Sequence, residues 1–334
     1  MRYVVIGAGA IGGVVGGLLV DQGHEVALVA RGAHGDAIRD RGLEVRRPDR
    51  TLHVRPRTAT TVSELGLAAG DMLLLAVKSQ QTAALLDEIA SLAVGGERAG
   101  DVLPILHLQN GVANEDAALR MFAAVHGVCV NLPATHLEPG VVIGEGADVA
   151  GILQLGLAPG GADEIDRTVA GALASAGFRA DVVDDVMAFK RAKLLRNLGN
   201  ALDALCGSDL PPDAEEVVDA LAARAAEEGL AAFAAAGLPV VDDATWSAAL
   251  AGGVRTAPVG GQDRRGGSTW QSVARGQGSV ETDHLNGEIV RVGRLHGVRT
   301  PVNLLLQREM WRLVTERAEP GSRRAADLLA AVTS

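Results

Sequence analysis

Short apolar runs alternate with glycine-rich or polar segments along the N-terminal part of the chain. Residues 3–6 form an apolar run with the length of a buried strand, and the apolar segment that continues to Val20 has the length of a helix. A polar turn at residues 21–23 separates this segment from a second apolar run at residues 25–29. The pattern predicts a strand, a helix and a second strand, which together make the first half of a βαβ unit.

The alternation of strands and helices continues over the first half of the chain. The clearest later elements are predicted strands at residues 72–77, 102–108, 141–143 and 152–155 and a helix at residues 163–176. From about residue 184 the strand signal fades, and helical patterns rich in alanine and leucine dominate. We therefore expect an α/β fold, in which residues 1–183 form a doubly wound parallel sheet and residues 184–334 form a second, all-helical domain.

A glycine-rich motif, Gly7-Ala8-Gly9-Ala10-Ile11-Gly12, joins the first predicted strand to the helix. In this context it is the dinucleotide-binding fingerprint of Rossmann-type folds. Gly7 permits the tight turn, Gly9 lets the backbone approach a pyrophosphate, and Gly12 lets the helix pack closely on the strand. We expect Gly7, Gly9, Ala10, Ile11 and Gly12 to bind the cofactor, because free N–H groups at the helix start face its phosphates. The alternative is a glycine-rich turn without a ligand.

The residue after the second predicted strand bears on the choice of cofactor. An NAD enzyme usually places Asp or Glu there to accept a hydrogen bond from the ribose 2′-hydroxyl, but this chain has Ala30-Arg31. A cation suits a 2′-phosphate, so Arg31 predicts NADPH as the cofactor. The alternative is an ordinary surface arginine in an arginine-rich chain.

Composition agrees with an enzyme of two domains. The 334 residues exceed the usual limit for one hydrophobic core, and 48% apolar content is enough for two. The net charge of −10 argues against a nucleic-acid surface, and no apolar run is long enough to span a membrane. The fingerprint starts at residue 7, which leaves no room for a cleaved targeting segment. Cys129 and Cys206 fit neither a metal site nor a disulfide framework, so we expect no metal and a cytoplasmic location.

Lysine is rare in this chain, because only three of its 31 basic residues, Lys78, Lys190 and Lys193, are not arginine. A lysine can give up a proton in a protein, whereas an arginine stays protonated. Lys78 follows a predicted strand directly, and Asn110 follows the next one. Both are site candidates, because ligands bind beyond the carboxyl ends of parallel strands. For Asn110, a plain turn with Gly111 is the alternative.

A helix predicted at residues 184–205 carries the third lysine. Counting about 100° per residue places Lys193, Asn197 and Asn200 within an arc of roughly 60°, opposite a leucine stripe. Asparagine is a poor helix former, so its presence here indicates that the side-chain amides are needed. The alternative is a solvated helix face, which this chain usually fills with Arg, Glu or Asp.

The C-terminal region adds two further candidates. In a helix predicted near residues 279–295, Glu281 lines up with apolar residues and could face a pocket, or it could cap the helix start. Ser268 could donate a hydrogen bond to a carboxylate. The preceding loop at residues 251–267 is interpreted as either a lid or a mobile segment. Thr300-Pro301 is typical of a helix N-cap followed by proline at the first helical position.

Taken together, these residues resemble the ketopantoate reductase (2-dehydropantoate 2-reductase) family over nearly the whole chain. The resemblance rests on the glycine motif with Arg31, on Lys78, on Gln109-Asn110-Gly111, on Lys193-Leu194-x-x-Asn197, on Asn200 to Leu205, on Ser268 with Gln271, on Glu281-x-Asp283-x-x-Asn286-Gly287 and on Thr300-Pro301-x-Asn303. The chain departs from the family in spacing Asn197 and Asn200 three rather than four residues apart, with Ala201 in place of the usual proline.

The resemblance implies reduction of a 2-oxo acid by NADPH, with ketopantoate as the first candidate and Lys193 protonating the developing alkoxide. Asn197, Asn200, Ser268 and Glu281 would bind the substrate, and Lys78 and Asn110 would lie where cofactor and substrate meet. The partner would be a small molecule, neither nucleic acid nor membrane, and a homodimer is possible. Two alternatives are a reductase or dehydrogenase for another branched or hydroxylated 2-oxo acid, and an NADPH-binding sensor without catalysis.

Overall fold

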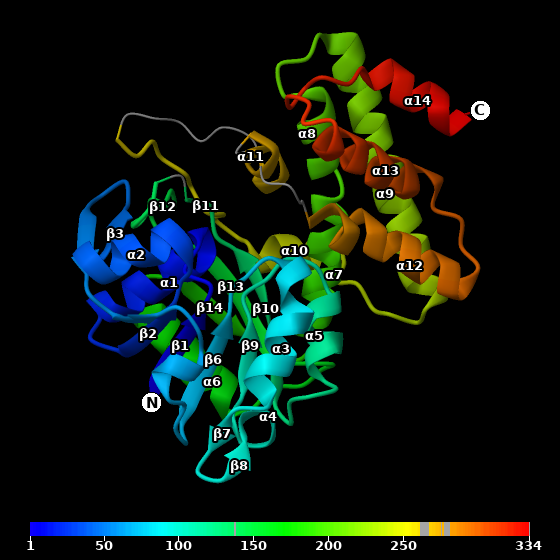
Figure 1. Cartoon of the computed structure of the whole chain (residues 1–334). Helices are drawn as coiled ribbons and strands as arrows, with labels where there is room; N and C mark the ends of the chain where they lie inside the picture. The colour runs from blue at the N-terminus through cyan, green and yellow to red at the C-terminus, as the bar shows by residue number, and fades with distance from the viewer. Residues whose placement is uncertain (137, 261–266, 275, 277–280, 334) are drawn as a thin grey trace. The chain divides into compact units, whose positions relative to one another are not determined.

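The computed structural model describes residues 1–136, 138–260, 267–274, 276 and 281–333, apart from the side chains of Ser268 and Thr333. The chain forms two compact units (Figure 1). The first contains residues 1–189 and 243–264, and the second contains residues 190–242 and 265–334. These units are defined by packing, and the division at residues 183 and 184 stays a prediction about functional domains.

The first unit is built on an eight-stranded sheet with the order β14-β13-β10-β9-β6-β1-β2-β5. All neighbouring strands in it are parallel except β10 and β13. The strands are β1 (Arg2–Ile6), β2 (Glu25–Val29), β5 (Arg57–Ala59), β6 (Asp71–Leu75), β9 (Ile105–His107), β10 (Val125–Asn131), β13 (Ile152–Leu157) and β14 (Arg179–Val182). Because the central strands are buried on both faces, most of their residues are apolar. The predicted α/β fold with a parallel sheet is confirmed, except that β10 and β13 are antiparallel.

The first unit also contains helices and short turns, most of which connect its strands. They are α1 (Ala10–Asp21), α2 (Gly32–Arg41), η1 (Ser63–Leu65), η2 (Ser79–Gln81), α3 (Thr82–Ala90), α4 (Ala99–Val102), α5 (Ala113–Ala118), α6 (Glu164–Ser175) and α10 (Asp243–Ala249), with the small strands β7 (Ala93–Val94) and β8 (Glu97–Arg98). One face of the sheet forms a continuous core with α1 and α6, in which Leu18 and Leu173 pack with Leu74 and Val128.

A second sheet packs on α1, and the sequence pattern did not predict it. It has four strands in the order β11-β12-β3-β4: β11 (Ala134–Thr135), β12 (Val141–Gly144), β3 (Leu43–Arg46) and β4 (Thr51–Val54). The predicted strand at residues 141–143 is therefore real, but it belongs to this sheet and not to the main one.

Four glycines let α1 fit between the two sheets. A Cβ atom on Gly16 would lie 2.8 Å from Leu28 of the main sheet, and one on Gly17 would lie 2.4 Å from Val45 of the second sheet. A Cβ on Gly13 would lie 2.7 Å from Val142, and one on Gly12 would lie 2.1 Å from the carbonyl oxygen of Gly7. Since carbon atoms do not approach closer than about 3.5 Å without repulsion, the two sheets hold α1 more closely than any larger residue allows.

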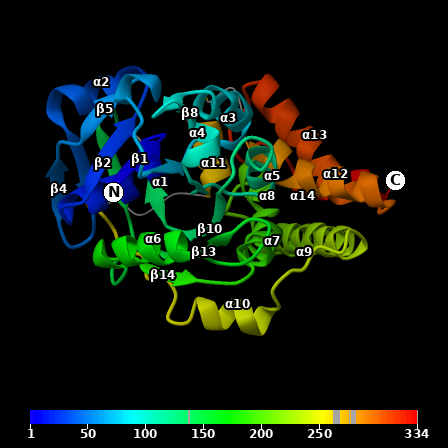
Figure 2. The ribbon, with the colours of Figure 1, turned by 90° about the horizontal axis from the view of Figure 1, so that it is seen from below.

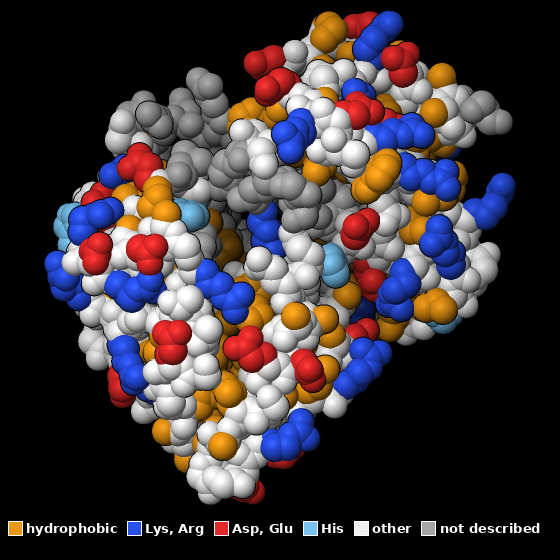
Figure 3. Space-filling view, viewed as in Figure 1, with side chains coloured by type: hydrophobic (Ala, Val, Ile, Leu, Met, Phe, Trp, Pro, Cys, Tyr) orange, Lys and Arg blue, Asp and Glu red, His pale blue; other side chains and the backbone are white. Residues whose placement is uncertain are grey.

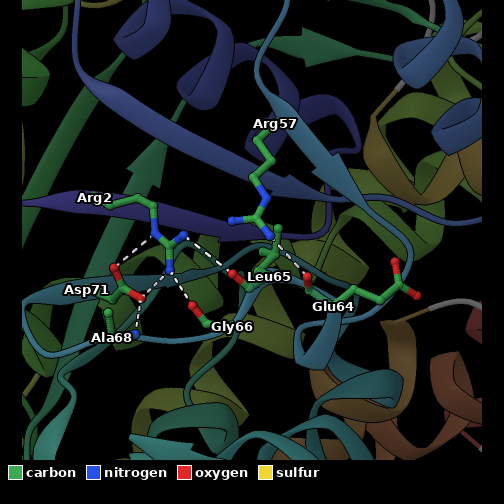
Figure 4. Close-up of polar contacts among 7 residues, drawn as sticks. All are labelled: Arg2, Arg57, Glu64, Leu65, Gly66, Ala68 and Asp71. Atoms are coloured by element: carbon green, nitrogen blue, oxygen red, sulfur yellow. Dashed lines mark hydrogen bonds and ion pairs between the residues drawn. The ribbon is translucent and has the colours of Figure 1, made fainter. Parts of the chain in front are cut away.

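An ion pair joins the starts of the neighbouring strands β1 and β6 of the main sheet (Figure 4). The guanidinium of Arg2 donates to both carboxylate oxygens of Asp71, at 3.0 and 2.6 Å, and so joins β1 to β6. It also donates to the carbonyl of Gly66, while Asp71 accepts from the N–H of Ala68. Asp71 is only 3% exposed, and these bonds satisfy its buried charge.

Residues 243–257 belong to the first unit and are attached to it by several bonds. Arg179 of β14 donates to the carbonyls of Ala249 and Ala251, both at 2.6 Å, and Figure 2 shows α10 beside β13 and β14. Farther along, Arg255 forms a bidentate pair with Asp148. The start of the predicted lid or mobile loop at residues 251–267 is therefore anchored, and residues 261–266 lie outside the described residues.

The second unit is helical, as predicted for the C-terminal part. It contains α8 (Asn200–Cys206), α9 (Pro212–Ala235), α11 (Ser268–Ala274), η3 (Glu281–His284), α12 (Asn286–His296), α13 (Pro301–Thr315), α14 (Ala325–Thr333) and most of α7 (Val186–Asn197). The long α9 packs on α12, α13 and α14. Among the described residues, no helix combines the length and the apolar character that crossing a membrane would require.

Two predicted helices differ from the observed ones. The helix expected at residues 184–205 is interrupted at Leu198 and Gly199, which separate α7 from α8. The helix expected near residues 279–295 begins only at Asn286, and a 3₁₀ turn precedes it. Angular counting assumes an unbroken α-helix, so the predicted alignments of Asn200 and Glu281 with their helices do not hold.

Candidate functional site

The glycine loop has the geometry that its sequence requires. Gly7 has a φ of +101°, and a Cβ there would lie 2.8 Å from Val77. The N–H groups of Gly7 and Ala8 both donate to the carbonyl of Val29, which fixes the loop to β2. Nothing lies within 4 Å of a Cβ built on Gly9. The loop is therefore closed toward the protein at Gly7 and open at Gly9, where a ligand can approach the backbone.

Helix α1 starts directly after this open position. Gly9 is its N-cap, no side chain caps it in the described part of the chain, and its first turn has no acidic residue. The N–H groups of Ala10 and Ile11 have no carbonyl within the helix to bond, because the first turn of any helix lacks such partners. An uncapped helix start beside an open glycine fits the phosphates of a dinucleotide.

Arg31 is the N-cap of α2, and its side chain is exposed. Its Nε donates to the carbonyl of Thr60 at 3.4 Å, and Arg39 donates to the hydroxyl of the same residue at 3.3 Å. Two guanidinium groups therefore meet at Thr60, just beyond the carboxyl ends of β2 and β5. Glu64 lies next to them, because its carboxylate accepts from the N–H of Thr60.

Lys78 and Asn110 follow the adjacent strands β6 and β9, and a small polar network joins their segments. Lys78 is the half-buried N-cap of η2, and the hydroxyl of Ser79 donates to the carbonyl of Asn110 at 3.5 Å. Asn114 donates from Nδ2 to both groups, at 3.1 Å each. The structure therefore brings these two predicted residues to the same edge of the sheet.

The side chain of Gln109 adds further hydrogen bonds next to this polar network. Its Nε2 donates to the carbonyl of Val77 and to the hydroxyl of Thr82, both at 2.8 Å, and its Oε1 lies 2.9 Å from Nδ1 of His107. Gln109 is 4% exposed, so these bonds satisfy a buried amide. The sequence analysis gave Gln109 and Asn114 no role, although both lie within four residues of Asn110.

Lys193 and Asn197 lie on α7, one helical turn apart, and both are half-buried. Residues four apart on a helix occupy the same side, so this part of the predicted arc holds. Lys190, which received no role in the sequence analysis, is only 3% exposed on the same helix. Asn197 is the last residue of α7.

Asn200 begins α8, and the segment before Ser268 lies next to it. The N–H of Gly267 donates to the carboxylate of Asp203 at 2.9 Å, and a Cβ on Gly267 would lie 3.6 Å from the amide oxygen of Asn200. Asp203 therefore holds the backbone that leads into α11. Ser268 is the first residue of α11, and its side chain lies outside the described residues.

A buried asparagine pair supports the break between α7 and α8. Asn286 donates from Nδ2 to the carbonyl of Leu198 at 3.3 Å and to Oδ1 of Asn303 at 3.0 Å. Asn303 donates to the carbonyl of Ala225 and to Glu228, both at 2.9 Å. Both asparagines are at most 1% exposed. A helix break leaves carbonyls without helical partners, and here one of them is bonded by a side chain.

The side chain of Glu228 also caps the start of α13. Thr300 is the N-cap and Pro301 the first residue of that helix, as predicted, but the Thr300 side chain makes no capping bond. The carboxylate of Glu228 accepts instead from the N–H groups of Val302 and Asn303, at 2.8 and 3.0 Å. A carboxylate at a helix start also interacts favourably with the helix dipole.

Glu281 opens the 3₁₀ turn η3 and is half-buried. The next acidic residue, Asp283, is exposed and accepts from Nε2 of Gln307 at 2.7 Å. Thr282, between them, is 3% exposed, and its hydroxyl has no hydrogen-bond partner among the described residues.

Two other groups of reactive side chains have structural explanations. His126, Asp163 and Asp166 could in principle hold a metal ion, but Asp163 and Asp166 form the capping box of α6, and Asp166 lies 2.8 Å from Nδ1 of His126. Burial raises the pKa of the Cys206 thiol to about 11, which keeps it neutral and unreactive.

Comparison with known proteins identifies the family. The sequence matches the family described as "Ketopantoate reductase PanE/ApbA" over residues 3–159 and its C-terminal part over residues 185–311. It is 29% identical over 329 residues to a 2-dehydropantoate 2-reductase of Pyrococcus horikoshii, a match that covers 96% of this chain and 99% of the relative.

Two solved structures resemble the whole chain. A PanE/ApbA family ketopantoate reductase from Ralstonia eutropha JMP134 superposes with a TM-score of 0.77 at 29% identity, covering 95% of this chain and 99% of the other. A D-mandelate dehydrogenase with NADH and anilino(oxo)acetate has the same TM-score and coverage at 21% identity, which shows a shared fold. The resemblance seen in the sequence is confirmed: the chain belongs to the ketopantoate reductase family and is an oxidoreductase.

Proposed function

We propose that the protein reduces a 2-oxo acid with NADPH, that 2-dehydropantoate (ketopantoate) is its substrate, and that Lys193 is the general acid. The observation that carries the proposal is the open, uncapped start of α1 at Gly9, which fits a dinucleotide. The family match and the 2-dehydropantoate 2-reductase among the relatives support the substrate.

Gly7, Gly9, Ala10, Ile11 and Gly12 would hold the pyrophosphate of the cofactor. When bound, the reduced nicotinamide supplies a hydride to the keto carbon. Lys193 in its ammonium form stabilises the negative charge that develops on the keto oxygen and donates a proton to it. The product is a 2-hydroxy acid, and the neutral amine of Lys193 then regains its proton from water.

The choice of NADPH rests on Arg31 and its surroundings. Arg31 and Arg39 both contact Thr60, so two cations lie where the 2′-phosphate of the adenosine ribose would bind. Asp36 pairs with Arg39 and Glu64 bonds to Thr60, so the local charge is partly neutralised. Arg31 is bonded only through its Nε among the described contacts, which leaves the rest of its guanidinium for a phosphate.

The remaining predicted residues would orient the reactants. Lys78 and Asn110 lie at the carboxyl edge of the sheet and would contact the cofactor and substrate there. In the second unit, Asn197 and Asn200 flank the helix break, and the backbone before Ser268 is fixed beside Asn200. We propose that Asn197, Asn200, Ser268 and Glu281 bind the 2-oxo acid, with Glu281 directed to its hydroxyl group.

One specific observation favours a second candidate substrate class. The D-mandelate dehydrogenase with the same fold was solved with anilino(oxo)acetate, which is also a 2-oxo acid. The close spacing of Asn197 and Asn200 changes the shape of the substrate site more than the hydride chemistry. A reductase or dehydrogenase for another branched or hydroxylated 2-oxo acid is therefore the alternative, followed by an NADPH-binding sensor without catalysis.

Steady-state oxidation of NADPH and NADH against a panel of 2-oxo acids tests these alternatives. We expect ketopantoate to have the highest kcat/KM and NADPH to be preferred. A higher kcat/KM for another branched 2-oxo acid would support the second candidate. Tight binding of NADPH without turnover of any oxo acid would support the sensor.

The role of Lys193 needs a separate comparison. General acid catalysis typically contributes on the order of 10²–10⁴ in rate, so Lys193→Met should lower kcat by about that factor. Arg196→Met, a change of an exposed basic residue on the same helix, is the control and should retain activity. A Lys193→Met enzyme as fast as wild type would remove Lys193 from the mechanism.

Two further proposals concern the cellular location and the oligomeric state of the protein. Both cysteines are free and buried, which is compatible with the cytoplasmic location expected from the sequence. The homodimer stays a prediction, which sedimentation equilibrium of the full chain would test.

A further inference from the structure

We propose that His34 is a positioning residue for the dinucleotide loop, because its imidazole ring joins the carbonyl of Ala8 to the N–H of Gly140. This inference rests on the proposed binding of a dinucleotide at Gly9. His34 lies in the first turn of α2 and received no role in the sequence analysis.

The two bonds of the ring define its protonation state. The N–H of Gly140 donates to Nδ1 over 2.9 Å, so Nδ1 accepts and carries no proton. The proton of the neutral ring is then on Nε2, which lies 2.7 Å from the carbonyl oxygen of Ala8 and donates to it. A neutral imidazole thus uses both nitrogens, and a doubly protonated ring would place a donor against the Gly140 N–H.

Burial is consistent with this state, since it lowers the pKa of His34 below the ordinary histidine value. The ring of His136 packs against that of His34 in a tilted arrangement, with 4.1 Å between ring centroids. The ring is therefore held on its face as well as at its two nitrogens.

The bond to Ala8 completes the fixation of the loop. The N–H groups of Gly7 and Ala8 are bound by Val29, and the carbonyl of Gly9 accepts from the N–H of Gly13. The Ala8 carbonyl between them is held by His34. Because a peptide unit is planar, holding this carbonyl also fixes the direction of the N–H of Gly9. The His34 bond therefore determines how the backbone meets a pyrophosphate.

His34 also connects this loop to two other parts of the first unit. Gly140 leads into β12, whose Val142 packs on Gly13 of α1, so His34 links the loop to a sheet that also contacts α1. On its own helix, His34 follows Arg31 by one turn. Loss of the ring should therefore loosen the phosphate-binding loop and the start of α2 together.

The test compares His34→Leu with His34→Gln in the full-length protein, using NADPH as the probe. Leucine removes both hydrogen bonds, whereas the glutamine amide can donate to Ala8 and accept from Gly140. His53→Leu is the matched control, because His53 lies on β4 of the second sheet and its side chain is 71% exposed. Titration gives the NADPH Kd, kinetics give KM and kcat, and circular dichroism verifies folding.

We expect His34→Leu to raise the Kd and KM for NADPH about tenfold while kcat at saturating NADPH falls less than about twofold. His34→Gln should recover most of the affinity, and His53→Leu should match wild type. A merely structural loss would not be rescued by glutamine. The inference is overturned if His34→Leu binds NADPH as tightly as wild type, if glutamine gives no rescue, or if kcat rather than affinity is lost.

Failure of the proposed function would look different. If wild-type protein binds neither NADPH nor NADH, the dinucleotide site itself is wrong, and the role of His34 is refuted with it. If wild type binds NADPH but reduces no 2-oxo acid, the proposed reaction is wrong, while the affinities of the His34 variants still decide the present inference.

Discussion

The Nδ2 group of Asn286 donates a hydrogen bond to the carbonyl of Leu198, the first residue after the end of α7. Without it, this carbonyl would be buried without a partner, at a cost of about 1–3 kcal/mol. We therefore expect Asn286→Ala to lower the free energy of unfolding by that amount and to lower kcat, because Lys193 and Asn197 lie on the turn just before the break.

Thr282→Val is the control for Asn286→Ala. The Thr282 hydroxyl is buried without a partner among the described residues, so replacing it with a methyl group should leave the free energy of unfolding unchanged or raise it. Urea denaturation and steady-state kinetics give both quantities. If Asn286→Ala loses stability but keeps full kcat, the bond to Leu198 has no effect on the reaction.

The packing of α1 between two sheets makes a second prediction. A methyl group on Gly17 would lie 2.4 Å from Val45, so Gly17→Ala should destabilise the protein by about 1–3 kcal/mol. Gly171 lies in the middle of α6 with open space around it, and Gly171→Ala should stabilise the protein by about 0.5–1 kcal/mol. Thermal or urea unfolding checks the opposite signs, and equal effects would contradict the close contact.

Arg31 makes a prediction about cofactor preference. We expect wild type to prefer NADPH to NADH by at least about tenfold in kcat/KM, which corresponds to about 1.4 kcal/mol, and Arg31→Ala to remove most of this preference. Activity with NADH should change little. Arg50→Ala, in which another partly exposed arginine of the same unit is lost, is the control. Equal use of both cofactors by wild type would show that Arg31 does not bind a 2′-phosphate.

Glu281 makes a prediction about substrate discrimination. A hydrogen bond to the carboxylate of Glu281 is available only to a substrate that carries the hydroxyl group, so that hydroxyl should matter only while Glu281 is present. Glu281→Ala should lower kcat/KM for a hydroxylated 2-oxo acid about tenfold more than for one without the hydroxyl. Asp283→Ala, in the same turn, should affect both substrates alike. Equal losses with Glu281→Ala would remove it from this role.

Stability should fall at acidic pH partly because of His34. Burial lowers the pKa of His34, so as the pH falls through its ordinary value the unfolded chain binds the proton before the folded protein does. Folding is therefore stabilised above this range and progressively destabilised as the pH approaches the folded-state pKa. The neighbouring titratable and charged groups are His136, which faces the ring, and Arg41, near Gly140.

Urea denaturation between pH 7 and pH 5 measures this effect. The difference in unfolding free energy between the two pH values should be smaller for His34→Gln, because glutamine does not titrate. An equal difference in both proteins would show that His34 binds a proton equally well folded and unfolded.

The sequence was sufficient to predict the glycine loop and five strands of the main sheet, β1, β2, β6, β9 and β13, but not β5, β10 and β14. Buried parallel strands such as β1 and β6 are continuous apolar runs, and the glycines mark backbone positions where a side chain cannot fit, as Gly7 shows. The second sheet was not predicted because its strands are short and partly exposed. Strand β4, for example, has four residues, of which only Val54 is buried.

Candidate site residues could be named from the sequence, but their arrangement could not be predicted. Lys78 and Asn110 were correctly placed at strand ends, whereas the bonds that join them depend on Gln109 and Asn114, whose partners are distant in sequence. Likewise, Asn200 and Glu281 were placed by assuming regular helices. The break at Gly199 depends on a bond from Asn286, 88 residues away from Leu198, and no local pattern contains that information.

Basic and acidic side chains are interspersed over the first unit on the face drawn in Figure 3. Arg31 and Arg39 are exposed and Thr60 is half-buried, whereas the glycines of α1 are buried in the core. The proposed preference for NADPH over NADH could therefore be altered largely through exposed positions at the adenosine end. The proposed pyrophosphate end is less tolerant of change, since a Cβ on Gly7, Gly12 or Gly13 would lie less than 3 Å from neighbouring atoms, although the position at Gly9 is open.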